Sequence, residues 1–188
     1  MLNSIAKPLN KILIPHFEGE VAMFPFDLSD LNTVPKQHRD IVKQMIQKLP
    51  NKKGTAFLTV HGKFVKKSET LRRGAPHIDG NYISFTEGWD NPPPSNPTWN
   101  TEPSLNGGML IATNYSACKG WIGKYDGVPK EGGDCSHIKL GEGFMLESNK
   151  VYYGSSQFIH ESLPLDRDVF RIMYRITLPA EHPPLFAE

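Results

Sequence analysis

Hydrophobic and polar positions alternate most clearly near the end of the chain, over residues 169–178. One side of this predicted strand is entirely apolar, with Phe170, Ile172, Tyr174, Ile176 and Leu178. The other side includes Arg171 and Arg175 in the middle of the strand. We expect the apolar side to pack under a helix. The arginine side is expected either to face solvent or to line a cavity that binds an anion.

A helical period follows Pro35 and ends near Leu49. The lysines and the arginine of this segment lie largely off one face. The apolar residues share that face: Ile41, Val42, Met45, Ile46 and Leu49. Thr33 is suited to cap this helix, and Pro35 suits its first turn. Pro50 is expected to end it. The pattern predicts one helix whose apolar stripe packs on a sheet.

The other hydrophobic runs are short, and glycine and proline separate them. They predict strands over 55–60, 82–86, 108–113, 121–125, 136–140, 144–146 and 151–160. With the last strand they indicate a mainly β protein, a jelly-roll-like barrel or sandwich, with the helix ahead of it. We expect one domain over 1–188, with an N-terminal helical support (1–54), a β-barrel core (55–178) and a C-terminal tail (179–188).

Composition and charge narrow the function classes. The chain has 188 residues and a formal net charge of +1, which disfavours nucleic acid as a partner. The basic pair Arg72-Arg73 is expected to be part of a solvated face. No apolar run approaches the ~20 residues of a membrane span, and the start of the chain does not resemble a signal peptide. Cys118 and Cys135 are expected to be reduced thiols in the cytoplasm, with one disulfide between them as the alternative.

Candidate metal chemistry begins at His77-Ile78-Asp79. In extended chain, residues two apart point the same way, so His77 and Asp79 can reach one ion. An imidazole and a carboxylate suit a divalent first-row metal. The triplet alone is a weak signal, because Asp79-Gly80 can equally supply a simple turn.

A second histidine, His160, lies late in a strand-like run and precedes a turn through Pro164. Arg171 follows His160 by eleven residues, in the last predicted strand. This order of HxD, distant histidine and basic residue resembles the 2-oxoglutarate- and Fe(II)-dependent oxygenase superfamily. The sequence HESLPL, which begins at His160, is similar to the segment after the distal histidine in the prolyl-hydroxylase-like branch. The resemblance covers residues 70–178.

The resemblance implies a double-stranded β-helix with a cupin-like barrel, and a dioxygenase that is expected to act as a hydroxylase. It implies that Fe(II) is held by His77, Asp79 and His160, with no separate catalytic residue, and that 2-oxoglutarate is the cosubstrate. In the family, a basic residue on a late strand binds the far carboxylate of 2-oxoglutarate. Arg171 is the first candidate here, and Arg175, of the same parity, is the alternative.

The chain departs from the family in one respect. Families with arginine at this spacing often continue Arg-x-Ser, whereas Met173 stands at that place. We therefore expect Tyr82 or Tyr153 to add the missing hydroxyl.

Aromatic residues are the candidates for binding the substrate, which is expected to be a small molecule or a protein side chain. Trp89 and Trp99 flank a proline-rich loop over 86–106 that is expected to cover the site. Tyr115 and Trp121 are further candidates, although aromatics in strands are more often core residues.

Other functions and sites stay open as alternatives. A cupin-type metalloenzyme that does not use 2-oxoglutarate is disfavoured because cupin sites usually carry HxH. A catalytically silent barrel with a binding or structural role is the other alternative. Asp134 and His137 form a weaker candidate ligand pair, and His61 is expected to be structural. The remaining histidines are expected at the surface, namely His16, His38 and His182.

Overall fold

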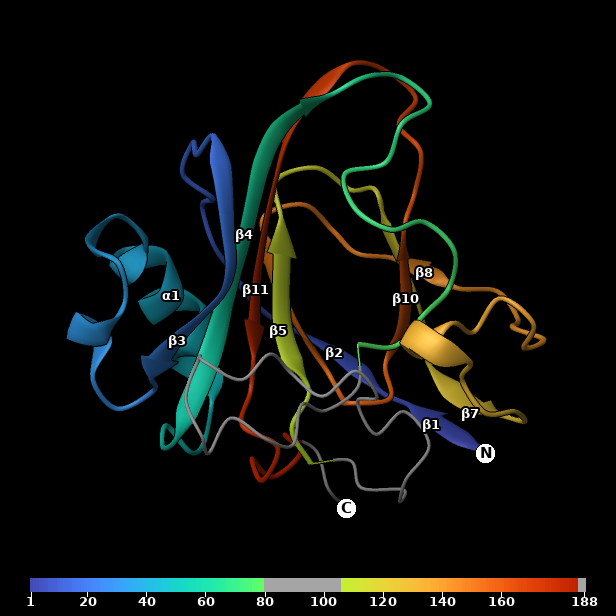
Figure 1. Ribbon diagram of the computed structural model, residues 1–188, viewed down its shortest axis with the longest axis horizontal. Helices are drawn as coiled ribbons and strands as arrows, with labels where there is room; N and C mark the ends of the chain where they lie inside the picture. The colour runs from blue at the N-terminus through green and yellow to red at the C-terminus, as the bar shows by residue number, and fades with distance from the viewer. Residues whose placement is uncertain (80–105, 186–188) are drawn as a thin grey trace.

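The computed structural model describes residues 1–79 and 106–185, and it shows a mainly β protein with antiparallel sheets and one short helix (Figure 1). The strands are β1 (Leu2–Ser4), β2 (Ala6–Lys11), β3 (Gly19–Asp27), β4 (Thr55–Val65), β5 (Met109–Thr113), β6 (Cys118–Trp121), β7 (Gly123–Tyr125), β8 (Phe144–Met145), β9 (Lys150–Gly154), β10 (Ile159–Ser162) and β11 (Val169–Thr177). The helix α1 (Arg39–Met45) lies between 3-10 turns at Lys36–His38 and Ile46–Lys48. Further 3-10 turns are Leu31–Thr33 and Glu131–Gly133.

The largest sheet has the strand order β2-β9-β5-β11-β4-β3, and β11 pairs with both β4 and β5 at its centre. A three-stranded sheet has the order β10-β6-β8, and β1 pairs with β7. Figure 1 shows α1 on one side of the large sheet and β10 and β8 on the other. The large sheet therefore has a helix side and a site side, and β11 contributes to both.

The helix side is an apolar core. Ile172, Tyr174 and Ile176 of β11 are buried there against Ile41 and Met45 of α1. This confirms the prediction that the apolar row of the last strand packs under a helix. Residues two apart on a strand share a face, so the row places Arg171 and Arg175 on the site side.

Two buried histidines contradict the expectation that they lie at the surface. His38 is only 1% exposed, and its Nδ1 lies 2.9 Å from the hydroxyl of Tyr174. His182 is also buried, and its Nε2 lies 2.9 Å from the carbonyl oxygen of Asn51. Each imidazole is accommodated because a polar partner is buried beside it. His16 is exposed, as expected.

The N-terminal part of the chain differs from the prediction. Segment 1–54 contains three strands, β1 to β3, and β2 and β3 form the two edges of the large sheet. The helix is short and bounded by 3-10 turns. Thr33 does not cap it, because Thr33 lies in the preceding 3-10 turn, where its hydroxyl donates to the carbonyl of Asp30.

One predicted strand was wrong, and two others were each divided between two strands. Segment 136–140 contains no strand, since a turn from Cys135 to Ile138 occupies it. Segment 151–160 is divided by a turn in which the amide of Phe158 donates to the carbonyl of Ser155, so β9 and β10 belong to different sheets. Segment 121–125 is likewise divided at Ile122 between β6 and β7. The strand expected over 82–86 lies outside the described residues.

Cys118 and Cys135 are both free and buried. Burial raises the pKa of Cys118 to about 12 and that of Cys135 to about 11, so both are neutral thiols at physiological pH. In the described part of the chain, no helix has the length and apolar character needed to cross a membrane.

Candidate metal centre and its cationic cavity

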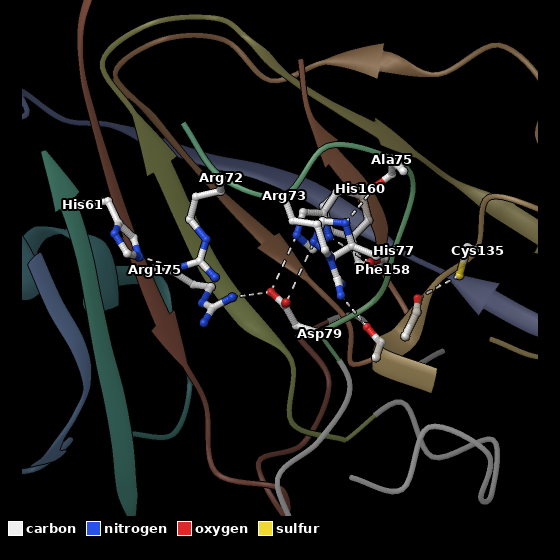
Figure 2. A network of polar contacts seen from close by, with 12 residues as sticks. His61, Arg72, Arg73, Ala75, His77, Asp79, Cys135, Phe158, His160 and Arg175 are labelled. Atoms are coloured by element: carbon white, nitrogen blue, oxygen red, sulfur yellow. Dashed lines mark hydrogen bonds and ion pairs between the residues drawn. The ribbon is translucent and has the colours of Figure 1, made fainter. Parts of the chain in front are cut away.

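Two segments far apart in the sequence bring three potential metal ligands together. His77 and Asp79 lie on the segment that follows β4, and His160 lies on β10. The backbone amides of His77 and His160 each donate to the other's carbonyl at 3.0 Å, which fixes the two residues opposite each other. One potential ligand atom from each of the three side chains lies within 4.8 Å of the others. Figure 2 shows both imidazoles directed toward the Asp79 carboxylate.

The hydrogen bonds of the two imidazoles orient their ligand atoms. Nδ1 of His77 lies 2.9 Å from the carbonyl of Ala75, and Nδ1 of His160 lies 3.1 Å from the carbonyl of Phe158. A carbonyl only accepts, so each Nδ1 carries the proton when the ring is neutral. Each Nε2 then presents a lone pair to Asp79, at 4.0 Å for His77 and 3.6 Å for His160. Three acceptors that face one another are an arrangement that can hold a metal ion.

The protonation states of the triad suit metal binding. Burial and the neighbouring His160 lower the pKa of His77 to about 3, and burial also lowers the pKa of His160. Burial by itself would raise the pKa of Asp79, but Arg175 and the two histidines outweigh it and hold that pKa well below the usual range. Two neutral imidazoles and an ionised carboxylate are the forms that bind metal. This donor set fits a divalent first-row ion with open coordination positions.

Arg175 of β11 holds the carboxylate of the triad. Its Nη1 donates to Oδ2 of Asp79 at 2.5 Å, and its Nη2 lies 3.8 Å from the sulfur of Met23. Its Nε is buried and has no hydrogen-bond partner among the described residues. A charge-assisted bond of this kind fixes the orientation of a ligand carboxylate.

Arg171 lies on the same face of β11 as Arg175, but it is not bonded to a carboxylate of the described chain. Its side chain is 2% exposed, and its Nη1 donates to the hydroxyl of Ser162 on β10 at 3.3 Å. Its Nε has no partner, and within residues 1–79 and 106–185 it makes no ion pair. Burial lowers its pKa, but a guanidinium stays charged in proteins. A buried charge without a counterion costs several kcal/mol, so an anion in the cavity would compensate the charge of Arg171.

One cavity joins these groups. The space within it is about 480 Å³ including its open mouth. It is lined by Leu71, Arg72, Arg73, His77, Ile111, Thr113, Cys118, His160, Ser162, Arg171, Met173 and Arg175. Of the two alternatives for the arginine side of β11, the cavity is therefore the one that the structure shows.

Tyr153 does not reach this cavity. It is fully buried in the helix-side core, and its hydroxyl donates to the carbonyl of Gly107 at 3.5 Å. The neighbouring Tyr152 is the residue of β9 that faces the site side. The structure thus places the hydroxyl of Ser162, rather than that of Tyr153, beside Arg171.

Two aromatic candidates for substrate binding, Tyr115 and Trp121, are not part of the described cavity lining. Trp121 is buried behind the triad with Ile78 and Ile159, and its Nε1 donates to the carbonyl of Gly141 at 3.0 Å. The hydroxyl of Tyr115 donates to Asp166 at 2.7 Å. The other two candidates for substrate binding, Trp89 and Trp99, lie outside the described residues, as does nearly all of the loop over 86–106. Tyr82, the other candidate for the missing hydroxyl, also lies outside them.

The weaker ligand pair does not form a metal site in the described chain. His137 is exposed, and its Nε2 lies 3.1 Å from the carbonyl of Val128. The carboxylate of Asp134 accepts from the amide and the hydroxyl of Ser136.

Sequence reasoning missed several polar residues that line the cavity, among them Ser162 and Arg72. Ser162 follows His160 by two positions on β10, and this shared parity was the available signal. Arg72 was assigned to a solvated face, but it is half-buried, and its Nη1 contacts Nε2 of His61. His61 is structural in the sense expected, because it holds the side chain of Arg72.

No protein-family model, no curated protein and no solved structure matches this chain. The triad and its cavity are therefore the observations from which a function has to be inferred.

Proposed function

We propose that this protein is a 2-oxoglutarate- and Fe(II)-dependent oxygenase, and specifically a hydroxylase of a small molecule or a protein side chain. One observation carries the proposal. A buried guanidinium that makes no ion pair with any described residue, that of Arg171, lines the same cavity as two neutral imidazoles and adjoins a carboxylate, in the arrangement of a metal triad. A metal with open positions and a nearby anion-binding group are the two things that a chelating keto-dicarboxylate requires.

We also propose that the two larger sheets form the walls of a double-stranded β-helix. Support comes from the core between them. Met173 and Ile111 of the large sheet pack there with Cys118 of β6 and with Phe158. The triad would then lie where β10 faces the large sheet.

His77, Asp79 and His160 would hold Fe(II), and Arg175 would keep Asp79 in its ligating orientation. When bound, Fe(II) supplies the redox chemistry by which 2-oxoglutarate, dioxygen and a C–H group become succinate, carbon dioxide and an alcohol. Arg171 would bind the far carboxylate of 2-oxoglutarate, assisted by the hydroxyl of Ser162. Burial of this arginine excludes water from the carboxylate and strengthens the contact.

Arg171 is favoured over Arg175 as the 2-oxoglutarate anchor because Arg175 is already bonded to Asp79. We expect Arg171→Ala to weaken 2-oxoglutarate binding by about 30- to 150-fold, since a charge-assisted bidentate contact contributes roughly 2–3 kcal/mol. Metal affinity should change little. Arg175→Ala should instead weaken metal binding by about 10- to 100-fold, because it removes the residue that orients the metal ligand Asp79.

The test is a pair of calorimetric titrations on each variant, one with Mn(II) and one with 2-oxoglutarate in saturating Mn(II). Arg167→Ala is the matched control, because Arg167 is an exposed arginine that does not line the cavity. Fe(II)-dependent conversion of 2-oxoglutarate to succinate by the unmodified protein is the accompanying assay. A protein that binds Mn(II) tightly but shows no affinity for 2-oxoglutarate would refute the proposal and leave a metal-binding β protein.

A further inference from the structure

Met23 of β3 has a backbone conformation that favours glycine. Its φ is 46°, in the left-handed region that residues with a Cβ rarely adopt. The register of β3 on β4 shifts between Val21 and Phe24. Ala22 and Met23 therefore oppose one residue of β4, Thr59, and this arrangement is a β-bulge. The backbone at Met23 is strained, and such strain persists where the surrounding contacts hold it in place.

The bulge turns the side chain of Met23 toward the site side of the large sheet. Val21 packs against the helix-side core, and in a regular strand Met23 would share its face. Instead, the sulfur of Met23 lies 3.8 Å from Nη2 of Arg175. The amide of Met23 donates at 3.3 Å to the hydroxyl of Thr59, which is directly opposite Arg175 in the register of β4 and β11. The bulge thus directs a side chain of the edge strand at an arginine of the central strand.

The contact of Met23 reaches the metal triad through Arg175. Nη1 of the same guanidinium donates to Oδ2 of Asp79 (Figure 2). Contacts to both terminal nitrogens fix the plane of a guanidinium as well as its position. Met23 is not part of the described cavity lining, so it acts on the triad from behind this arginine. Met23, Arg175 and Asp79 therefore form a chain of contacts that leads from the edge of the sheet to the candidate metal ligands.

The chemistry of a thioether suits this position. Its sulfur is an uncharged and weak acceptor, so it can orient a guanidinium without neutralising the charge. A carboxylate at position 23 would compete with Asp79 for Arg175. A leucine would fill a similar space but could not accept a hydrogen bond. Methionine therefore holds Arg175 and leaves the charge of this arginine for Asp79.

The bulge also has a role in the fold alone, since β3 is an edge of the large sheet. Bulges on edge strands discourage pairing with other chains. That role requires the extra residue but no particular side chain at position 23, and glycine would suit the left-handed backbone better than methionine. The two roles therefore predict different responses to substitution of Met23.

We propose that Met23 is a positioning residue of the metal centre, and that its sulfur holds Arg175 in the orientation that presents Asp79 to the metal. This inference rests on the metal site of the oxygenase proposed above, and it does not depend on the cosubstrate. Loss of the sulfur should weaken metal binding less than loss of Arg175 itself, because the bond from Arg175 to Asp79 remains possible.

The test is a calorimetric titration of the full chain with Mn(II). Met23→Leu keeps an apolar side chain of similar size but loses the acceptor, and it should weaken Mn(II) binding by about 2- to 10-fold, the value of a net hydrogen bond. Met23→Gln supplies an amide oxygen at a similar length and should bind Mn(II) within about twofold of the unmodified protein. If Met23 only filled space, the order would be reversed, because leucine would be tolerated and glutamine would not. The reversed order would overturn the inference.

A second pair of variants separates the metal site from the fold. Met23→Ala and Met23→Gly both lack the sulfur and should lose the same Mn(II) affinity. Glycine relieves the strained φ, so Met23→Gly should have the higher midpoint in urea denaturation. Metal affinity that instead follows the urea midpoint across these variants would show that Met23 acts only on the fold. Met145→Leu is the matched control, because Met145 of β8 is exposed, and it should leave Mn(II) affinity unchanged.

A double variant tests whether Met23 acts through Arg175. In an Arg175→Ala background, Met23→Leu should cause no further loss of Mn(II) affinity, since the group that the sulfur orients is already absent. An equal loss in both backgrounds would contradict a positioning role.

The outcomes separate this inference from the oxygenase function. If the unmodified protein binds Mn(II) and 2-oxoglutarate but every Met23 variant binds Mn(II) equally well, the inference fails and the oxygenase function stands. If the Met23 variants respond as expected but 2-oxoglutarate does not bind, the inference stands and the oxygenase function fails. If the unmodified protein does not bind Mn(II), both fail.

Discussion

The two faces of β11 are equally buried but differ in how completely their polar groups are satisfied. On the helix side, the polar group among the apolar side chains of β11 is the hydroxyl of Tyr174, and it has His38 as its partner. On the site side, Arg171 and Arg175 each keep a buried Nε without a partner in the described structure. The helix side therefore has its polar group satisfied, whereas the site side has donors that a ligand could satisfy.

The buried histidines show the same contrast. Both ring nitrogens of His38 have neutral partners, the hydroxyl of Tyr174 and the side-chain amide of Gln37 at 3.2 Å. His160 has one such partner, the carbonyl of Phe158, and its other nitrogen faces the Asp79 carboxylate. A histidine with two partners belongs to a core, whereas an unprotonated nitrogen that faces a carboxylate indicates a place for a cation.

The largest effect should come from opening a cavity on the helix side. Ile176 is fully buried against the helix side, and Ile176→Ala should lower the free energy of unfolding by about 2–5 kcal/mol. Because the change lies on the far side of the sheet, affinity for Mn(II) should stay within about twofold of the unmodified protein. Urea denaturation and a Mn(II) titration measure the two quantities. A large loss of metal affinity in a folded Ile176→Ala protein would show that the faces are coupled.

The site side should respond in the opposite direction. We expect Arg171→Met to raise the free energy of unfolding of the ligand-free protein by about 1–3 kcal/mol, because an apolar side chain replaces an uncompensated buried charge. The same variant should lose its affinity for 2-oxoglutarate. Urea denaturation of the ligand-free variant and of the unmodified protein measures this difference in unfolding free energy. A destabilised Arg171→Met protein would mean that Arg171 is retained for the fold and not for a ligand.

A smaller effect is expected from pH. Burial lowers the pKa of His38 below its ordinary value of about 6.5. The unfolded chain therefore binds a proton more readily, so this contribution to stability is complete above that value and is lost as the pH falls. In metal-free protein, His38→Gln should flatten the fall in unfolding free energy between pH 7 and 5, by at most about 1.4 kcal/mol per pH unit. Parallel pH profiles for the two proteins would count against this account.

The sequence was informative where strand parity alone decides which way a side chain points. The apolar row of β11 identified the helix side, and with it the inward direction of Arg171 and Arg175. The parity of His77 and Asp79 predicted that both can reach one ion, and the resemblance to the oxygenase superfamily supplied His160 as the third ligand. The inferences from parity depend only on local geometry, because side chains two residues apart on a strand point to the same face.

Prediction failed where a turn decides the end of a strand, or where a partner distant in sequence decides whether a side chain is buried. The turn between Ser155 and Phe158 divides one apparent strand into β9 and β10, so Tyr153 could not be assigned to a face from the sequence. His38 was placed at the surface because its partner, Tyr174, is remote in sequence. The role of Arg72 was hidden for the same reason, since His61 lies on another element.

The affinity of the protein for 2-oxoglutarate with and without Mn(II) is the most direct test of the proposed site. A site in which the cosubstrate contacts both the metal and Arg171 predicts tight binding in saturating Mn(II) and a large loss of affinity without it. Asp79→Asn, which removes the charged ligand of the triad, should show the weak affinity even with Mn(II) present. Equal affinity with and without Mn(II), or no binding in either condition, would contradict a metal- and 2-oxoglutarate-dependent oxygenase.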